Sequence, residues 1–271
     1  MYPTKYHKPK TLEEARELFT GSESASFLSG GHTLLPAMKL RLASATDLID
    51  LGGVSEMRGI TGDRQLLSIG ASTLHDEVGT SPIVRDLIPA LAGCAGSIGD
   101  RHVRHRGTIG GSVANNDPAA DYPASLLALA ATVVTDRRHI LAEEFFTGLY
   151  ETALQPGEIV LRVEFPVPSL ASYAKFRSNA SRYSVVGVFV ARMASGVRVA
   201  VTGAGSSGVF RVGPFEAALN ADYSPHALDN CEVDPSTLME DANGTPQYRA
   251  NLIKVMARRA VENPGVTKSF N

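Results

Sequence analysis

The chain has 271 residues, of which 44% are hydrophobic, and a formal net charge of −2 at pH 7. This length and apolar content can form a sizeable core in one large domain or in two, and the nearly balanced charge gives no reason to expect a nucleic acid as partner. Only two cysteines occur, Cys94 and Cys231, so the chain cannot supply the four thiolates of an iron–sulfur cluster or a zinc site, and we expect both to be unpaired.

The N-terminal part alternates between short helices and short strands. Residues 1–6 lack the apolar region of a signal peptide and no segment is long enough to cross a membrane, so we expect a cytoplasmic protein without an integral membrane segment. Thr11 and Glu14 form a capping box that begins a helix to about Phe19. The residues that follow predict a strand over 25–28, a strand over 45–51 that ends in a Gly-Gly turn, a hairpin over 60–71, a short helix capped by Ser72 or Thr73, and two helices over 82–96 divided at Pro89.

The rest of the chain continues this mixture. We expect a helix over 123–131, a hairpin over 132–141 that turns at 136–138, a strand over 159–165, three strands over 173–177, 185–193 and 197–202, and an amphipathic helix over 248–261. The segment 185–190 is almost wholly apolar, which predicts a central strand. Strands in hairpins with helices between them are typical of an α+β fold rather than of a doubly wound parallel sheet.

The proline cluster Pro166-Val167-Pro168 is our predicted domain boundary. It divides the chain into an N-terminal domain over 1–168, with sub-parts of about 1–53 and 54–168, and a C-terminal domain over 169–271.

Two stretches share a double glycine. The first is Ser29-Gly30-Gly31-His32-Thr33-Leu34-Leu35, and the second is Thr108-Ile109-Gly110-Gly111-Ser112, which precedes a polar run ending at Asp121. Glycine has no Cβ and accepts positive φ, so such loops bring backbone N–H groups close to a ligand, and successive N–H groups form an anion-binding concavity. We therefore predict that the two loops are opposite walls of one pyrophosphate site. The hydroxyls of Thr33 and Thr108, and the side chain of His32, can add contacts.

A rival motif, Gly203-Ala204-Gly205-Ser206-Ser207-Gly208, matches the G-x-G-x-x-G pattern of dinucleotide-binding Rossmann folds. It gives the alternative function, an NAD(P)-dependent oxidoreductase. Two features argue against it. Gly213-Pro214 would interrupt the helix that must follow, and Asp222 comes after a helical run rather than a strand.

The basic stretch 101–106 holds His102 and His105, but three arginines beside them would repel a cation, so we expect no metal site there. It leads into the second glycine loop, or it faces a partner or an anionic acceptor. No nucleophile–His–Asp set stands out, so we expect no covalent or acid–base catalysis and no catalytic residue in this chain.

The two glycine stretches resemble the FAD loops of the flavoprotein subunits of molybdenum hydroxylases, most closely those of the medium subunit of aerobic carbon monoxide dehydrogenases. The matching segments are 30–36 with 38–42, 104–111 with 114–118 and Asp121, 158–166, Lys175, Tyr183, and the late helix with Tyr248-Arg249 and 258–260. The resemblance therefore runs nearly end to end.

The resemblance implies a two-part FAD-binding domain of the vanillyl-alcohol oxidase type, followed by a small domain of antiparallel sheet and helices. It also implies two partner chains, a large molybdopterin subunit that oxidises the substrate and a small subunit with two [2Fe–2S] clusters. FAD in this chain would collect the electrons and pass them to an external acceptor. The substrate, which could be carbon monoxide, an aldehyde or an N-heteroaromatic, the acceptor and the oligomeric state stay open.

The resemblance also implies roles for single residues. Asp121 would contact FAD or its loops, Lys175 would lie near the isoalloxazine ring, Tyr183 would cover a flavin face, and Ile98 and Val160 would make apolar contacts. Each has a plainer alternative: an N-cap for Asp121, a solvated strand lysine for Lys175, and core packing for Tyr183, Ile98 and Val160.

Overall fold

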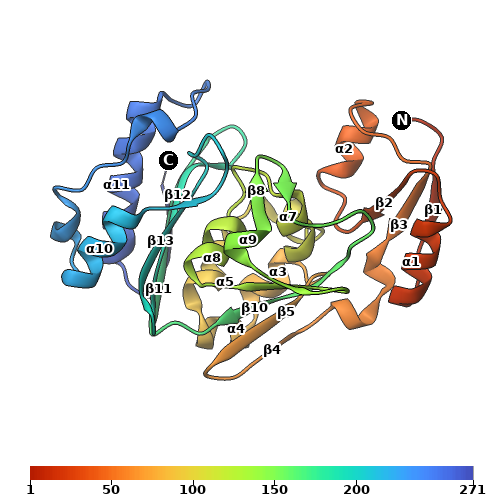
Figure 1. Cartoon of the computed structure of the whole chain (residues 1–271), viewed down its shortest axis with the longest axis horizontal. Helices are drawn as coiled ribbons and strands as arrows, with labels where there is room; N and C mark the ends of the chain where they lie inside the picture. The colour runs from red at the N-terminus through yellow and green to blue at the C-terminus, as the bar shows by residue number, and fades with distance from the viewer. Residues whose placement is uncertain (271) are drawn as a thin grey trace.

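Three larger β-sheets and one two-stranded sheet form the framework of the computed structural model, which describes residues 1–270 (Figure 1). The α+β character predicted from the sequence is confirmed. Figure 1 shows the three-stranded N-terminal sheet at one end of the molecule and the C-terminal sheet with α10 and α11 at the other, with most of the remaining helices between them.

The N-terminal sheet is parallel, in the order β1-β3-β2. Thr11 caps its first helix by accepting a hydrogen bond from the backbone N of Glu14 at 3.2 Å, as predicted. The elements of this part are β1 (Lys5–His7), α1 (Leu12–Thr20), β2 (Ala25–Leu28), α2 (Leu34–Lys39), β3 (Asp47–Asp50), η1 (Leu51–Gly53) and η2 (Ser55–Met57).

The second sheet is antiparallel, in the order β4-β5-β10-β6-β7, and six helices lie between β5 and β6 along the chain. Both predicted hairpins and the division at Pro89 are confirmed. The elements are β4 (Ile60–Gly62), β5 (Leu66–Gly70), α3 (His75–Thr80), α4 (Pro82–Leu87), α5 (Pro89–Gly96), α6 (Arg101–Arg104), α7 (Ile109–Asn115), α8 (Tyr122–Ala128), β6 (Thr132–Thr135), β7 (His139–Leu141), α9 (Ala142–Phe145), β8 (Phe146–Gly148), β9 (Glu151–Thr152) and β10 (Val160–Pro166).

The predicted cap of α3 is wrong. The helix begins at His75 after Leu74, so neither Ser72 nor Thr73 occupies the capping position. The Thr73 hydroxyl instead exchanges hydrogen bonds with the backbone N and O of Gly59, at 3.1 and 3.2 Å. This tertiary contact ties α3 to the turn before β4.

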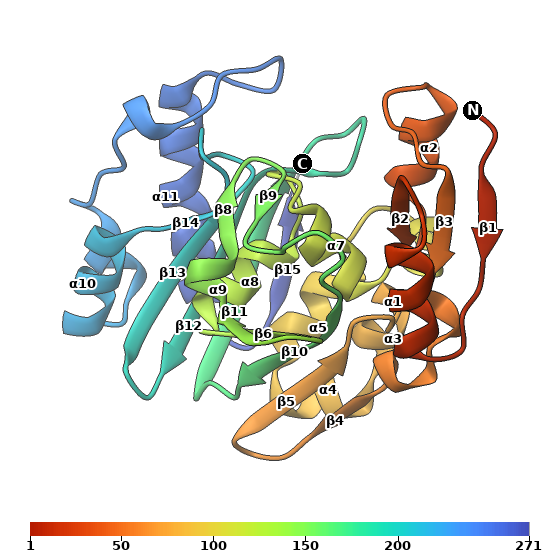
Figure 2. The same cartoon turned by 45° about the vertical axis from the view of Figure 1, so that its right-hand side comes forward.

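The third sheet has the order β14-β13-β12-β11-β15. The predicted central position of the apolar segment is confirmed, because β12 lies in the middle. One face packs against α10 and α11, and the other supplies Tyr173, Phe189 and Ala200 to the core beneath α5 and α8, as Figure 2 lets the reader follow. The elements are β11 (Leu170–Arg177), β12 (Ser184–Met193), β13 (Gly196–Thr202), β14 (Phe210–Arg211), α10 (Gly213–Ala221), η3 (Pro225–Leu228), η4 (Pro235–Thr237), α11 (Pro246–Glu262) and β15 (Thr267–Phe270).

The segment 166–168 connects the last strand of the second sheet to the first strand of the third. The domain division at this segment stays a prediction.

Candidate cofactor site

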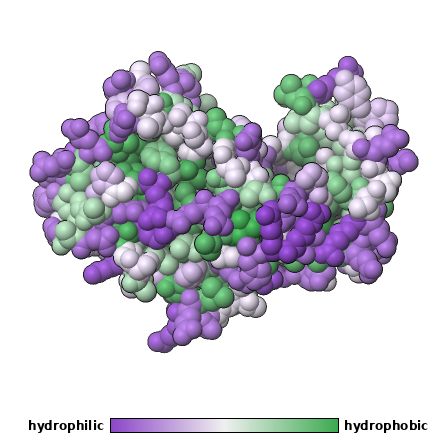
Figure 3. Space-filling view, in the orientation of Figure 1, coloured by the Kyte–Doolittle hydropathy of each residue, from purple (hydrophilic) through white to green (hydrophobic). Residues whose placement is uncertain are grey.

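A cavity of about 580 Å³ lies between the N-terminal sheet and the rest of the molecule. Most of its wall comes from four segments, 26–34, 98–121, 154–160 and 180–183, which are far apart in the sequence, and Leu51, Met57, Ala71 and His75 complete it. Figure 3 shows the hollow between these two parts on one face of the molecule. The volume falls in the range of about 300–1,000 Å³ that is usual for small-molecule and cofactor sites.

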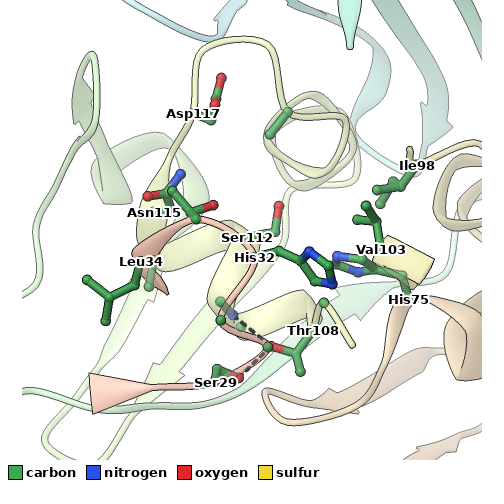
Figure 4. A pocket seen from close by; sticks show the side chains of 18 of the residues that line it. Ser29, His32, Leu34, His75, Ile98, Val103, Thr108, Ser112, Asn115 and Asp117 are labelled. Atoms are coloured by element: carbon green, nitrogen blue, oxygen red, sulfur yellow. Dashed lines mark hydrogen bonds between the residues drawn. The ribbon is translucent and has the colours of Figure 1, made fainter. Parts of the chain in front are cut away.

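The two double-glycine stretches meet at this cavity. The hydroxyls of Ser29 and Thr108 are hydrogen bonded at 2.7 Å, which Figure 4 marks with a dashed line. A Cβ at Gly30 would lie 2.4 Å from the carbonyl oxygen of Arg106 and 2.6 Å from Cα of Gly107. Only glycine allows the two backbones to approach so closely, so Gly30 joins the two loops.

The first loop offers a run of unpaired backbone donors. Gly31 has a φ of +75°, and within residues 1–270 no hydrogen bond is donated by the amides from Gly30 to Leu34. Consecutive free N–H groups of this kind favour an anion. Leu35 does not line the cavity; it packs against the small cluster around Met38 and supports the loop from behind.

The second loop differs from this expectation, because the amides of residues 109–112 are already used. The amide of Gly110 donates to Ala71 O at 2.9 Å, that of Ile109 to Thr73 O at 3.1 Å, and that of Gly111 to Thr108 Oγ1 at 3.1 Å. Thr108 is the N-cap of α7, and the helix lies so close to the end of β5 that a Cβ at Gly110 would be 2.4 Å from the Ala71 Cβ.

The members of the second loop divide between cavity and core. Thr108, Gly110, Gly111 and Ser112 line the cavity, whereas Ile109 is fully buried in the core. This loop therefore contributes shape and hydroxyl groups.

Asp121 is a buried acid on the cavity wall whose two carboxylate oxygens accept three side-chain hydrogen bonds. Its Oδ1 accepts from Tyr173 Oη at 2.5 Å and from Ser184 Oγ at 2.9 Å, and its Oδ2 accepts from Lys175 Nζ at 2.9 Å. Asp121 is the residue before α8, but its side chain makes no capping hydrogen bond, so the N-cap alternative does not describe it.

Lys175 lies behind Asp121. Its side chain is fully buried, and its Nζ also donates to Ser97 O at 3.4 Å. It is neither a solvated lysine nor part of the cavity wall, and its ammonium is hydrogen bonded to Asp121, which does line the cavity. Tyr173 and Ser184 were not predicted as part of this group. Burial, followed by the charge of Asp121, raises the pKa of Tyr173 well above its ordinary value, so this hydroxyl stays a donor.

The apolar residues named from the resemblance all line the cavity. Ile98 and Val160 lie on its wall, and Tyr183 stands at its rim with 47% of its surface exposed. Partial burial raises the pKa of the Tyr183 hydroxyl, and Asp117, Tyr150 and Asp121 add to the effect. An exposed aromatic ring beside a cavity is unlike a core residue, so core packing does not describe Tyr183.

The rival glycine motif serves the structure of the C-terminal sheet. Gly203 follows β13, its amide donates to Pro118 O at 2.8 Å, and its carbonyl accepts from Nη1 of the buried Arg249 at 2.5 Å. Both partners of β13 are antiparallel to it, and the next helix begins only at Gly213. A Rossmann site needs a parallel strand followed directly by a helix, so this motif lacks the required context.

Within residues 1–270, no group of three or more His, Cys, Asp or Glu side chains is arranged to hold a metal ion. His105 lies near Arg101 O and Asp76, at 2.9 and 3.8 Å from its Nδ1. Nor does the described part of the chain contain a helix that is long and apolar enough to span a membrane.

Comparison with known proteins agrees with this geometry. Residues 2–168 match the family described as the FAD binding domain in molybdopterin dehydrogenase. The carbon monoxide dehydrogenase medium chain of Hydrogenophaga pseudoflava is 34% identical over an alignment of 275 positions. The alignment covers 94% of this chain and 95% of that protein. The nicotine 6-hydroxylase medium subunit of Paenarthrobacter nicotinovorans is 32% identical, with 96% and 97% covered.

A solved structure of the Hydrogenophaga pseudoflava carbon monoxide dehydrogenase matches 97% of this chain and 98% of its own chain, with a TM-score of 0.86 and 33% identity. The chain therefore belongs to the family of FAD-binding domains of molybdopterin dehydrogenases, and it is an FAD-binding oxidoreductase subunit similar over nearly its whole length to the medium chains of that family.

Proposed function

We propose that this chain binds one FAD in the 580 Å³ cavity and passes electrons through it within a complex of three kinds of subunit. In this proposal a large molybdopterin subunit oxidises the substrate, a small subunit carries two [2Fe–2S] clusters, and the flavin delivers the electrons to an external acceptor. The observation that carries the proposal is the run of unpaired amides from Gly30 to Leu34 on the cavity wall.

The residues present fit the charged part of FAD. A pyrophosphate that leaves water needs hydrogen-bond donors, and the first loop presents them without a dedicated lysine. The Thr33 side chain is exposed in the same loop, and the Ser29–Thr108 hydroxyl pair lies beside it. Of the second loop, Gly111 and Ser112 complete the wall by leaving room for the ligand rather than by offering amides.

The residues around Asp121 fit the flavin end. FAD, when bound, supplies the ability to accept and release electrons one or two at a time. Tyr183, Ile98 and Val160 provide the apolar surface that excludes water from a flat ring. Asp121 is held in place by three donors, so it can present a fixed carboxylate edge to the cofactor, and we propose that Lys175 influences the ring through Asp121.

The iron–sulfur clusters must lie on another chain in this proposal. A [2Fe–2S] cluster needs four protein ligands, usually thiolates, and this sequence contains two cysteines that are far apart and both free. The two relatives named above are medium chains of a carbon monoxide dehydrogenase and of a nicotine 6-hydroxylase, so similar medium chains occur in enzymes with different substrates. In this proposal the large subunit therefore decides the substrate. The cytoplasmic location stays a prediction.

Two charge substitutions test the FAD site. The purified chain should bind FAD near one to one, with flavin absorbance that survives gel filtration. Thr33→Glu places a negative charge among the first-loop amides and should abolish binding. Ser207→Glu places the same charge at an equally exposed position of the Gly203–Gly208 motif and should leave binding unchanged. A chain that stays colourless with its partner subunits present contradicts the proposal.

The electron path needs its own experiment. In the complex assembled with the large and small subunits, adding substrate without an acceptor should bleach the flavin absorbance. If the iron–sulfur signals change on reduction while the bound flavin stays oxidised, the proposed path through FAD is wrong.

A further inference from the structure

The cavity wall contains a histidine, His75, that belongs to neither glycine loop. His75 is the first residue of α3, and its backbone N donates to Gly107 O at 3.0 Å. Its side chain is buried, with 5% exposed, yet it lines the cavity. Figure 4 shows its ring beside Val103 and Ile98, on the side of the cavity where His32 also projects.

The polar atoms of this ring are not satisfied by the protein. Within residues 1–270 neither ring nitrogen of His75 has a hydrogen-bond partner, and of the two only Nδ1 is fully closed off from solvent. Gly107 lies so close that a Cβ there would be 2.6 Å from Nε2, and the other neighbour is the ring of Tyr122, with centroids 5.4 Å apart. Buried imidazoles usually have hydrogen-bond partners, so Nε2, the ring nitrogen that is not closed off, is the atom to which a ligand in the cavity would supply one.

The charge state limits what that partner can be. Burial lowers the pKa of His75 to about 4; Asp121 opposes this shift, and His32 and Arg104 add to it. The imidazole is therefore neutral at pH 7 and carries one N–H. This group can donate a hydrogen bond to an oxygen of the ligand, but the neutral ring cannot form an ion pair.

We propose that His75 is a ligand-binding residue of the cavity and that its neutral imidazole donates a hydrogen bond to an oxygen of the bound dinucleotide. The inference rests on the proposed FAD site and adds a contact from α3, which lies outside both glycine loops. It also explains why a polar, unpaired ring is kept in a wall that Ile98 and Val103 otherwise make apolar.

His75→Leu and His75→Gln in the full chain test this. His75→Leu removes the donor and keeps a similar volume, so the dissociation constant for FAD should rise about tenfold. The melting temperature of the FAD-free chain should stay the same or rise, because a buried unpaired polar group is gone. His75→Gln keeps a donor and should bind FAD within about threefold of the unchanged chain. His226→Leu, at a side chain that is 83% exposed in η3, is the control and should alter neither quantity.

The outcomes separate the two proposals. Equal FAD affinity in His75→Leu and the unchanged chain overturns the role of His75 and leaves the FAD site standing. A His75→Leu chain that melts earlier or does not fold assigns His75 to structure alone and also overturns the inference. If the unchanged chain does not bind FAD, the proposed function itself fails.

Discussion

Asp121 and Lys175 form a buried ion pair, with 2.9 Å between Oδ2 and Nζ, that joins the start of α8 to β11. The acid borders the cavity, and the lysine approaches from the C-terminal sheet, 54 residues later in the sequence. This pair ties the C-terminal sheet to the wall of the cavity.

Lys175→Met should destabilise the protein by about 3–5 kcal/mol, because it leaves a buried carboxylate without its cation. Urea unfolding followed by circular dichroism measures this. Lys268→Met is the matched control, since Lys268 is exposed on the neighbouring strand β15 and should change stability by less than about 0.5 kcal/mol. A loss below 1 kcal/mol at Lys175 would show that the pair does not support the site.

Gly30→Ala should weaken FAD binding at least tenfold. The added Cβ would lie 2.4 Å from Arg106 O, so the loops must separate and the Ser29–Thr108 hydrogen bond must lengthen. Fluorescence titration of the FAD-free chain gives the affinity. Gly96→Ala meets nothing within 4 Å and serves as control; equal affinities in the two variants would refute the joining role of Gly30.

Glu158 should make the protein sensitive to acid. Hydrogen bonds from Arg138, with further ones from the Gln155 backbone and Thr135, lower the pKa of Glu158 from 4.5 to about 2 despite its burial. A lowered pKa in the folded state stabilises the protein above the unfolded value of about 4.5, and this contribution is lost as the pH falls towards 2.

Comparison with Glu158→Gln isolates this effect. The unchanged chain should be more stable than the variant by about 2 kcal/mol at pH 7, and the difference should shrink towards zero between pH 4.5 and 2. Denaturant unfolding across this range measures it. A difference that does not vary with pH excludes Glu158 as the titrating group.

Arg249→Met should destabilise the C-terminal part by about 2–4 kcal/mol. The buried guanidinium donates to Val185 O at 2.6 Å and Gly203 O at 2.5 Å, and pairs with Asp241 at 2.5 Å, so its loss leaves buried carbonyls unpaired. Arg258→Met removes an exposed ion pair with Asp229 and should change stability by less than about 1 kcal/mol. Differential scanning calorimetry distinguishes the two, and equal melting temperatures would remove the structural explanation of the Gly203 segment.

Local signals in the sequence predicted much of the fold. The cap at Thr11, the break at Pro89 and the apolar run of β12 each depend on near neighbours, and each is found in the structure. The strand β1 was missed, because Lys5–His7 has no apolar pattern and exists only through pairing with β3. The edge strand β15 was missed for the same reason.

The site was predictable as a pair of loops but not in its hydrogen bonding. Whether the Gly110 amide is free depends on where Ala71 lies in space, and the burial of Lys175 depends on Asp121. His75 gave no signal beyond its position in a short helix, because an unpaired nitrogen is visible only once the surrounding walls are in place.

Amide hydrogen exchange of the full chain with and without FAD tests the central claim most directly. We expect the amides from Gly30 to Leu34 to gain protection when FAD binds, because they have no partner in the protein, and those of residues 109–112 to change little, because they are already hydrogen bonded. Unchanged exchange over 30–34, or new protection over 203–208 instead, would contradict the account.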